Sequence, residues 1–257
     1  MILSRISKAV REQNWFAVVL EFVIVIAGVV IGFQIQAWNE ARAAAAREDL
    51  MLLRLHREAE QNASYYTPRV ERNDEVIPLR EEAIALLASG DFEGVDLDRL
   101  TTAIDQARSL PTVSPPRGVY DEIVSSGLLS TTGDDALRNA LSVYWSYVDF
   151  LQGQIDYRRQ LQIDDPAIED FPFVRREFDP DHVLRIRTVI DFDAASRSDA
   201  FQEAVAVSHS RAVLMAYWWS EASQRAVALC AETARLTGQA CEPRPDTAAR
   251  VGGGEGR

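Results

Sequence analysis

Residues 15–35 read WFAVVLEFVIVIAGVVIGFQI, and this stretch decides the architecture expected for the chain. It is almost entirely apolar, with Glu21 and Gln34 as its clear exceptions. A helix crosses the roughly 30 Å hydrocarbon core of a bilayer with about 20 such residues, because each residue adds about 1.5 Å. No later stretch of the sequence is comparable. The sequence therefore predicts one transmembrane helix over residues 15–38, which would hold a single-pass protein in the lipid bilayer.

The charges beside this segment predict its orientation. The nearest basic residues are Arg5, Lys8 and Arg11 before it, and Arg42, Arg47 and Arg54 after it. The first three lie closer to the membrane edge, and cytoplasmic flanks are enriched in Lys and Arg. We therefore expect residues 1–14 to form a cytoplasmic tail, the segment to act as a signal anchor, and the body to lie outside the cytoplasm.

A cleaved signal peptide is the alternative for the same segment. The apolar core of a signal peptide is normally about 7–15 residues long and ends at a small-x-small site. Here the apolar stretch is longer, and the triplet Ala41-Arg42-Ala43 lies well beyond its end. The sequence favours retention of the segment as an anchor.

Polar and small residues share one side of the predicted membrane helix. At about 100° per residue, Glu21, Val25, Gly28, Gly32 and Asn39 fall on one face. Two glycines four residues apart let helices approach closely in lipid, and a carboxylate is less costly against a partner than against lipid. This face predicts packing with a second copy or another membrane protein. The alternative is that the glycine pair has no role in packing and that Glu21 lies at the level of the lipid headgroups.

The rest of the chain has helical periodicity. Residues 39–62 contain no Gly or Pro, which predicts a helical stalk over residues 39–64. Two later segments carry apolar seams with alternating spacings of four and three, typical of helices that pack in bundles. These seams are Leu137, Leu141, Tyr144, Val148, Leu151 and Ile155, and Phe201, Val205, Ser208, Ala212, Met215, Trp219, Ala222, Ala226 and Leu229. We expect an all-α fold, with an antiparallel helical bundle over residues 65–242 and a disordered tail over residues 243–257.

One segment is ambiguous. Residues 182–192, HVLRIRTVIDF, contain alternating β-branched residues that would allow a short strand. Residues 164–180 contain three prolines and clustered acids, and we expect them to be irregular. A strand at residues 182–192 would therefore have no evident partner, which disfavours it.

Two features of the body could serve a function. Cys230 and Cys241 could form a disulfide if the body lies outside the cytoplasm; in a reducing compartment they would be two thiols. Aromatic residues are numerous on two predicted helices, and not all can face the core. In the simplest interpretation they pack in the core or at its edge. Alternatively, Trp145, Tyr147 and Trp218 could line an aromatic pocket or a partner surface.

Composition and motifs argue against several function classes. The net charge is -12 and no basic patch is visible, so we expect no nucleic-acid partner. The three histidines have no metal-ligand spacing, and no nucleotide-binding or nucleophile motif is present. We therefore expect no catalytic residue, no metal and no cofactor.

Two stretches resemble a known family. Residues 21–42, EFVIVIAGVVIGFQIQAWNEAR, combine an initial Glu, a glycine-rich middle and a polar exit ending in Trp38-Asn39-Glu40. Residues 119–145, VYDEIVSSGLLSTTGDDALRNALSVYW, combine a short helix ending in Ser-Gly with a leucine-rich helix. Both resemble an uncharacterised family, a domain of unknown function, of bacterial single-pass inner-membrane proteins. The resemblance covers under a third of the chain and implies a location in the inner membrane but no activity.

These observations lead to one hypothesis and one alternative. We expect a non-enzymatic membrane-anchored protein whose extracytoplasmic helical domain binds a partner protein or assembles as a homo-oligomer. The alternative is an extracytoplasmic ligand-sensing helical bundle that signals through a partner.

Overall fold

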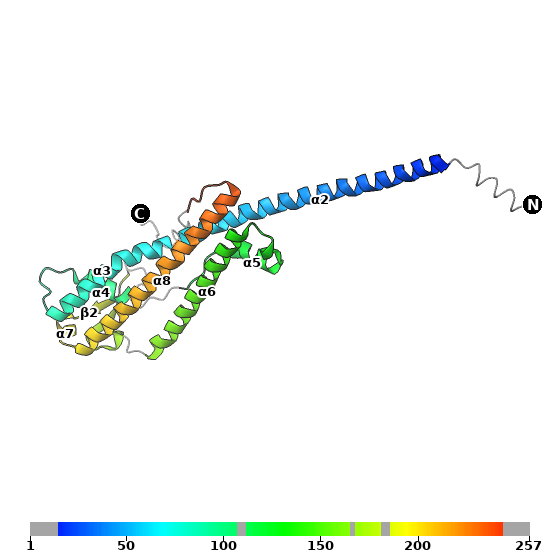
Figure 1. Ribbon diagram of the computed structural model, residues 1–257. Helices are drawn as coiled ribbons and strands as arrows, with labels where there is room; N and C mark the ends of the chain where they lie inside the picture. The colour runs from blue at the N-terminus through cyan, green and yellow to red at the C-terminus, as the bar shows by residue number, and fades with distance from the viewer. Residues whose placement is uncertain (1–14, 107–111, 165–167, 181–185, 244–257) are drawn as a thin grey trace, which may run out of the picture. The chain divides into compact units, whose positions relative to one another are not determined.

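The computed structural model describes residues 15–106, 112–164, 168–180 and 186–243 (Figure 1). The chain divides into two units, Met1–Met51 and Leu52–Arg257, and the second is called the body below. The predicted cytoplasmic tail, residues 1–14, and residues 244–257 of the predicted C-terminal tail lie outside the described residues.

Helix α2, Trp15–Tyr65, contains the whole predicted membrane segment and the whole predicted stalk. Every described side chain from Val19 to Leu50 is exposed. From Leu52 onward the helix belongs to the body and buries Leu52, Leu55, Ala59 and Ala63. Spacings of three and four residues place these side chains on one face of the helix. The second half of the predicted stalk is therefore a core helix of the body.

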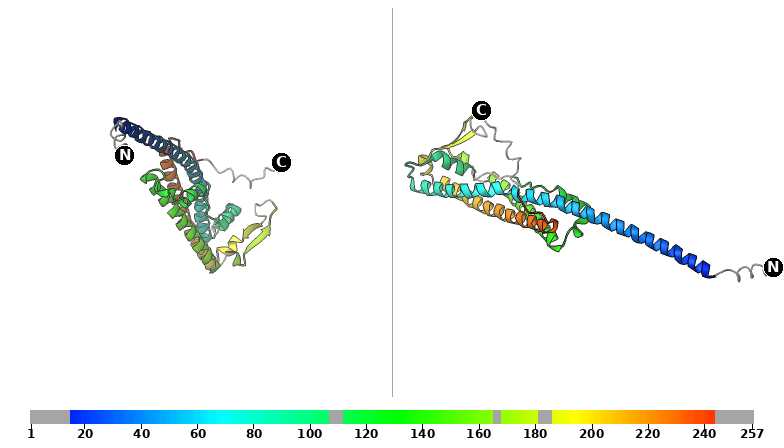
Figure 2. Two further views of the ribbon diagram at one scale, coloured as in Figure 1. Left: turned by 90° about the vertical axis from the view of Figure 1, so that its right-hand side faces the viewer. Right: turned by 90° about the horizontal axis from the view of Figure 1, so that it is seen from above.

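The body is built mainly from helices, as predicted. The main ones are α3 (Thr67–Ser89), α4 (Leu97–Gln106), α5 (Gly118–Ser125), α6 (Asp135–Asp164) and α8 (Asp199–Thr237), and the short elements are η1 (Leu128–Ser130), η2 (Ile168–Asp170) and α7 (Phe192–Ala195). Helix α3 continues through Pro78 and ends at Gly90, whose φ of 68° suits a residue without a Cβ atom. Helix α8 lies beside α6 and α3 and runs antiparallel to both (Figures 1 and 2).

The predicted seams form much of the core. All six seam residues of α6, from Leu137 to Ile155, are buried. On α8, seven of the nine are buried, and Ser208 and Ala212 are partly exposed. A second group of buried side chains joins α3 and α4 to the N-terminal end of α8 and includes Leu87, Ile104 and Phe201. The helical periodicity in the sequence therefore identified the surfaces along which these helices pack.

The prediction against a strand at residues 182–192 is wrong. Strand β2, Ile186–Ile190, pairs antiparallel with β1, Val174–Phe178, which lies in the segment expected to be irregular. Val174 is opposite Ile190, and both contribute to the apolar core beside Phe201. Packing of one end of the hairpin on the core supplies stability that an isolated pair of strands lacks.

Candidate functional site

The first candidate site is the predicted packing face on α2. Its five residues, Glu21, Val25, Gly28, Gly32 and Asn39, are all exposed on the helix. Nothing lies within 4 Å of a Cβ atom built on either glycine, so the helix surface is open there. Large exposed side chains such as Phe22 and Phe33 lie along the same helix. Such a continuous apolar surface is what a bilayer or a partner helix covers.

Among the described residues, this is the one helix long and apolar enough to cross a membrane. It lies near the N-terminus of the chain, as the sequence predicted. By its length and composition this helix fits a transmembrane or signal-anchor helix, and the packing of its polar face stays a prediction.

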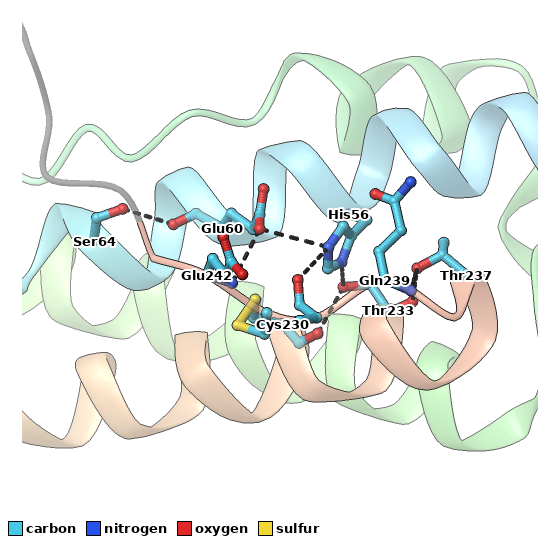
Figure 3. Close-up of polar contacts among 10 residues, drawn as sticks. His56, Glu60, Ser64, Cys230, Thr233, Thr237, Gln239 and Glu242 are labelled. Atoms are coloured by element: carbon cyan, nitrogen blue, oxygen red, sulfur yellow. Dashed lines mark hydrogen bonds and ion pairs between the residues drawn. A yellow bond between two sulfur atoms is a disulfide. The ribbon is translucent and has the colours of Figure 1, made fainter.

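The second candidate site is a strap formed by residues 239–243, which follows α8 (Figure 3). A disulfide joins Cys241 of the strap to Cys230 of α8, with Cα atoms 5.7 Å apart. The backbone N–H of Glu242 donates to Glu60 Oε1 at 3.0 Å. The strap is therefore tied to α8 by a covalent bond and to α2 by a hydrogen bond.

A buried histidine of α2 contacts the strap. His56 of α2 is 1 % exposed, and its Nε2 lies 3.2 Å from the carbonyl oxygen of Ala240. Its Nδ1 lies 2.9 Å from Thr233 Oγ1, and Glu60 Oε1 lies 3.6 Å from Nε2 (Figure 3). Because a carbonyl oxygen only accepts, Nε2 carries a proton and donates to Ala240. His56 therefore connects α2, α8 and the strap through both ring nitrogens.

A buried carboxylate fixes the start of α5. Glu58 of α2 is 6 % exposed and accepts from the backbone N–H groups of Val119 at 2.6 Å and Tyr120 at 3.0 Å. Burial raises the pKa of Glu58, and these two bonds oppose that shift. A neighbouring ion pair, Arg54 with Glu122 at 2.6 Å, joins the same two helices at the surface. Glu58 thus acts as a cap for the first turn of α5.

The three predicted aromatic pocket residues do not share one site. Tyr147 and Trp218 lie together, since the Tyr147 hydroxyl donates to the Trp218 carbonyl oxygen at 3.4 Å. Trp145 is buried and stacks on Tyr120 of α5, with ring centroids 4.9 Å apart. Trp145 and Tyr147 are two residues apart, so a helix turns them to nearly opposite sides. A surface pocket lies elsewhere, between α3 and α8, and Leu87 and Gln202 are among the residues that line it.

Sequence reasoning missed the roles of His56, Glu58 and Glu60, which it treated as residues of a stalk. The available signal was their position beside the apolar face of Leu55 and Ala59, where a polar side chain faces the body. The described residues contain no group of three His, Cys, Asp or Glu that could hold a metal ion. The polar side chains of this part of α2 bind backbone groups and stabilise the fold.

Comparison of the chain with known proteins found no match. No protein-family model, no curated protein and no solved structure matches the chain. The family resemblance of residues 21–42 and 119–145 therefore stays a prediction.

Proposed function

We propose that the chain is a non-enzymatic protein anchored in a bacterial inner membrane by the apolar part of α2. In this proposal, residues 1–14 lie in the cytoplasm and the helical body lies in the periplasm. The body and the anchor serve assembly, either with a second copy or with another membrane protein. The buried polar side chains His56 and Glu58 support a structural role for the body, because both are occupied in holding backbone groups.

The observation that carries the proposal is the exposed apolar surface of α2 between Val19 and Ile35. Burying a large apolar side chain is worth about 1.5–3 kcal/mol, so this much surface would strongly favour a bilayer over water. The same continuous helix supplies Leu55 and Ala59 to the core of the body. Helix α2 therefore contributes residues to both the anchor and the body.

The disulfide supports the proposed orientation. Disulfides such as Cys230–Cys241 persist in the periplasm and are rare in the reducing cytoplasm. This agrees with the weaker argument from basic residues before the apolar segment.

Fusion of two reporters after residue 257 tests the orientation. A reporter that functions only outside the cytoplasm should be active, and one that functions only in the cytoplasm should be inactive. The opposite pattern would overturn the proposed orientation and the compartment assigned to the disulfide.

Paired substitutions on the membrane helix test assembly through its polar face. We expect Gly28→Leu with Gly32→Leu to lower the mass of the detergent-solubilised particle measured by native mass spectrometry. The matched control is Val23→Leu with Val30→Leu, since both valines lie on the opposite side of the helix from Glu21. An unchanged mass in the glycine variant would refute packing through this face.

A further inference from the structure

The apolar part of α2 is followed by a tryptophan and, one turn later, by an arginine. Trp38 lies three residues after Ile35 and is 62 % exposed. The guanidinium carbon of Arg42 lies 5.7 Å from the centre of the Trp38 ring, which is within the range of a cation–π contact. Tryptophan rings and the long side chains of arginine are typical of the boundary between a bilayer and water. This pair therefore stands where the membrane segment would leave the lipid.

Trp38 and Arg42 continue an apolar side of the helix. At about 100° per residue, Leu20 and Ile24 lie within about 40° of Trp38, and both are exposed. Asn39, which belongs to the predicted packing face, lies about 100° from Trp38 and about 60° from Arg42. A partner helix on the packing face would therefore leave the pair in contact with lipid.

The guanidinium of Arg42 has no anionic partner in the protein. In the part of the chain that the structure describes, no group accepts a hydrogen bond from it and no carboxylate pairs with it. By contrast, Nε of Arg47 donates to the carbonyl oxygen of Ala43 at 3.1 Å. The nearest carboxylate in the sequence, Glu40, lies on almost the opposite side of the helix and accepts from Gln36 at 2.8 Å. Arg42 is thus free to bind an external anion.

The helix surface beyond Arg42 leaves room for such an anion. Residues 43–46 are four alanines, and all are exposed. The first carboxylate on the same side of the helix is Asp49, two turns further and about 10 Å along the axis. At physiological ionic strength, exposed charges at that separation are largely screened from each other. An anion can therefore approach Arg42 without strong repulsion from this part of the acidic chain.

The position of the guanidinium indicates which anion it meets. The polar headgroup layer adds about 5–8 Å to each side of a hydrocarbon core of about 30 Å. Trp38 lies about 5 Å beyond Ile35 along the helix, and Arg42 leans back over its ring. If the hydrocarbon core ends near Ile35, the guanidinium lies at the level of the lipid phosphates. A guanidinium binds a phosphate through two parallel N–H bonds.

We propose that Trp38 and Arg42 form a binding site for the phosphate group of a membrane phospholipid. Arg42 binds the phosphate, and the Trp38 ring lies among the headgroups beside it. The inference deepens the proposed anchoring function and rests on it. It names the lipid group that α2 recognises and the residues that set how far the helix enters the bilayer.

Native mass spectrometry of the full chain, released from phosphatidylglycerol vesicles, measures the lipid that the protein retains. We expect Arg42→Gln to lower the fraction of protein with bound lipid about ten-fold, because it removes the charged donor. The matched control is Arg47→Gln, which removes the same charge from an exposed position on the opposite side of the helix from Trp38. It should leave the fraction unchanged. Equal losses in both variants, or no loss in Arg42→Gln, would overturn the proposal.

The lipid composition tests whether the phosphate is the group recognised. The wild-type chain should retain phosphatidylglycerol and phosphatidylcholine, but about ten-fold less of a galactolipid without phosphate. Equal retention of the galactolipid would contradict phosphate recognition. Inorganic phosphate, compared with sodium chloride at the same ionic strength, should not displace the lipid. Displacement would assign the site to free phosphate and overturn the lipid proposal.

A second pair of variants tests the ring. Trp38→Ala should lower lipid retention, because it removes the side chain that packs beside the guanidinium and among the headgroups. Leu50→Ala is the control, since Leu50 is 60 % exposed but lies three turns further from the apolar segment. Equal retention in these two variants would overturn the role of Trp38.

Flotation with the vesicles separates this outcome from failure of the anchor itself. The wild-type chain and all four variants should float, because residues 19–35 are unchanged in each. A wild-type chain that does not float would refute the proposed anchor and the phosphate site together. A chain that floats, but retains equal lipid in Arg42→Gln and Arg47→Gln, would refute the phosphate site alone.

Discussion

Cys241→Ser should destabilise the body by an amount that follows from the position of the disulfide. The two cysteines are 11 residues apart in the sequence. Closing a loop of that length lowers the entropy of the unfolded chain by about 9 cal/mol/K, which corresponds to about 2.7 kcal/mol at 25 °C. For a body of about 200 residues, each kcal/mol shifts the melting temperature by about 2–4 °C. We expect the variant to melt about 5–10 °C below the oxidised wild-type protein.

Fluorescence of two buried tryptophans provides the assay. Trp145 and Trp219 are both 3 % exposed, so their emission changes when the body unfolds, whereas Trp38 of α2 is already 62 % exposed. The control is Gln239→Ser, an exposed residue of the strap that leaves the disulfide intact. A reducing agent should lower the melting temperature of the wild-type protein to that of Cys241→Ser and should not affect the variant.

Equal melting temperatures for Cys241→Ser and the oxidised wild-type protein would refute this reasoning. They would show that the cross-link does not restrict the unfolded chain. A loss much larger than 10 °C would show instead that the strap contributes through the fold, for example through the contact of His56 with Ala240.

Three further outcomes are expected from the body. Glu58→Ala removes the acceptor of the Val119 and Tyr120 N–H groups and should cost about 1–3 kcal/mol in urea unfolding; no loss would contradict the capping role. Burial raises the pKa of Glu58 above 4.5 in the folded state. The folded protein therefore loses stability as pH rises from the pKa of the unfolded state to that of the folded state, because Glu58 must then ionise while buried. Glu58→Gln should therefore gain stability relative to wild type as pH rises above about 4.5, and a parallel pH dependence of the two proteins would contradict the shift. Gly133→Ala should cost about 1–3 kcal/mol in the same assay, since φ is 57° and the new Cβ would lie 2.7 Å from Leu137 Cδ2; wild-type stability would show that the turn and this side chain relax freely.

The long helices were predictable because burial on a helix repeats with the helical period. The seam from Leu137 to Ile155 and most of the seam from Phe201 to Leu229 identify buried positions without knowledge of the partner helix. The same periodicity does not say what covers an apolar face. That is why Leu52 and Leu55 were assigned to a stalk, although the structure places them in the core of the body.

The hairpin was not predictable from β1 alone. Of its five residues, only Val174 is buried, and Arg175, Arg176, Glu177 and Phe178 are exposed. The alternation that marks a half-buried strand is therefore absent, because only one end of the hairpin rests on the core. Pairing with β2 is a tertiary contact, and strand propensity depends strongly on such context.

The polar contacts of α2 fix segments whose position the helical periodicity of the sequence does not predict. Segments without a helical repeat, such as the strap and the start of α5, have no apolar pattern from which their position can be predicted. In the structure each is fixed by a buried polar side chain, His56 for the strap and Glu58 for α5. Both side chains come from the same two turns of α2, so this stretch organises the irregular parts of the body as well as its core.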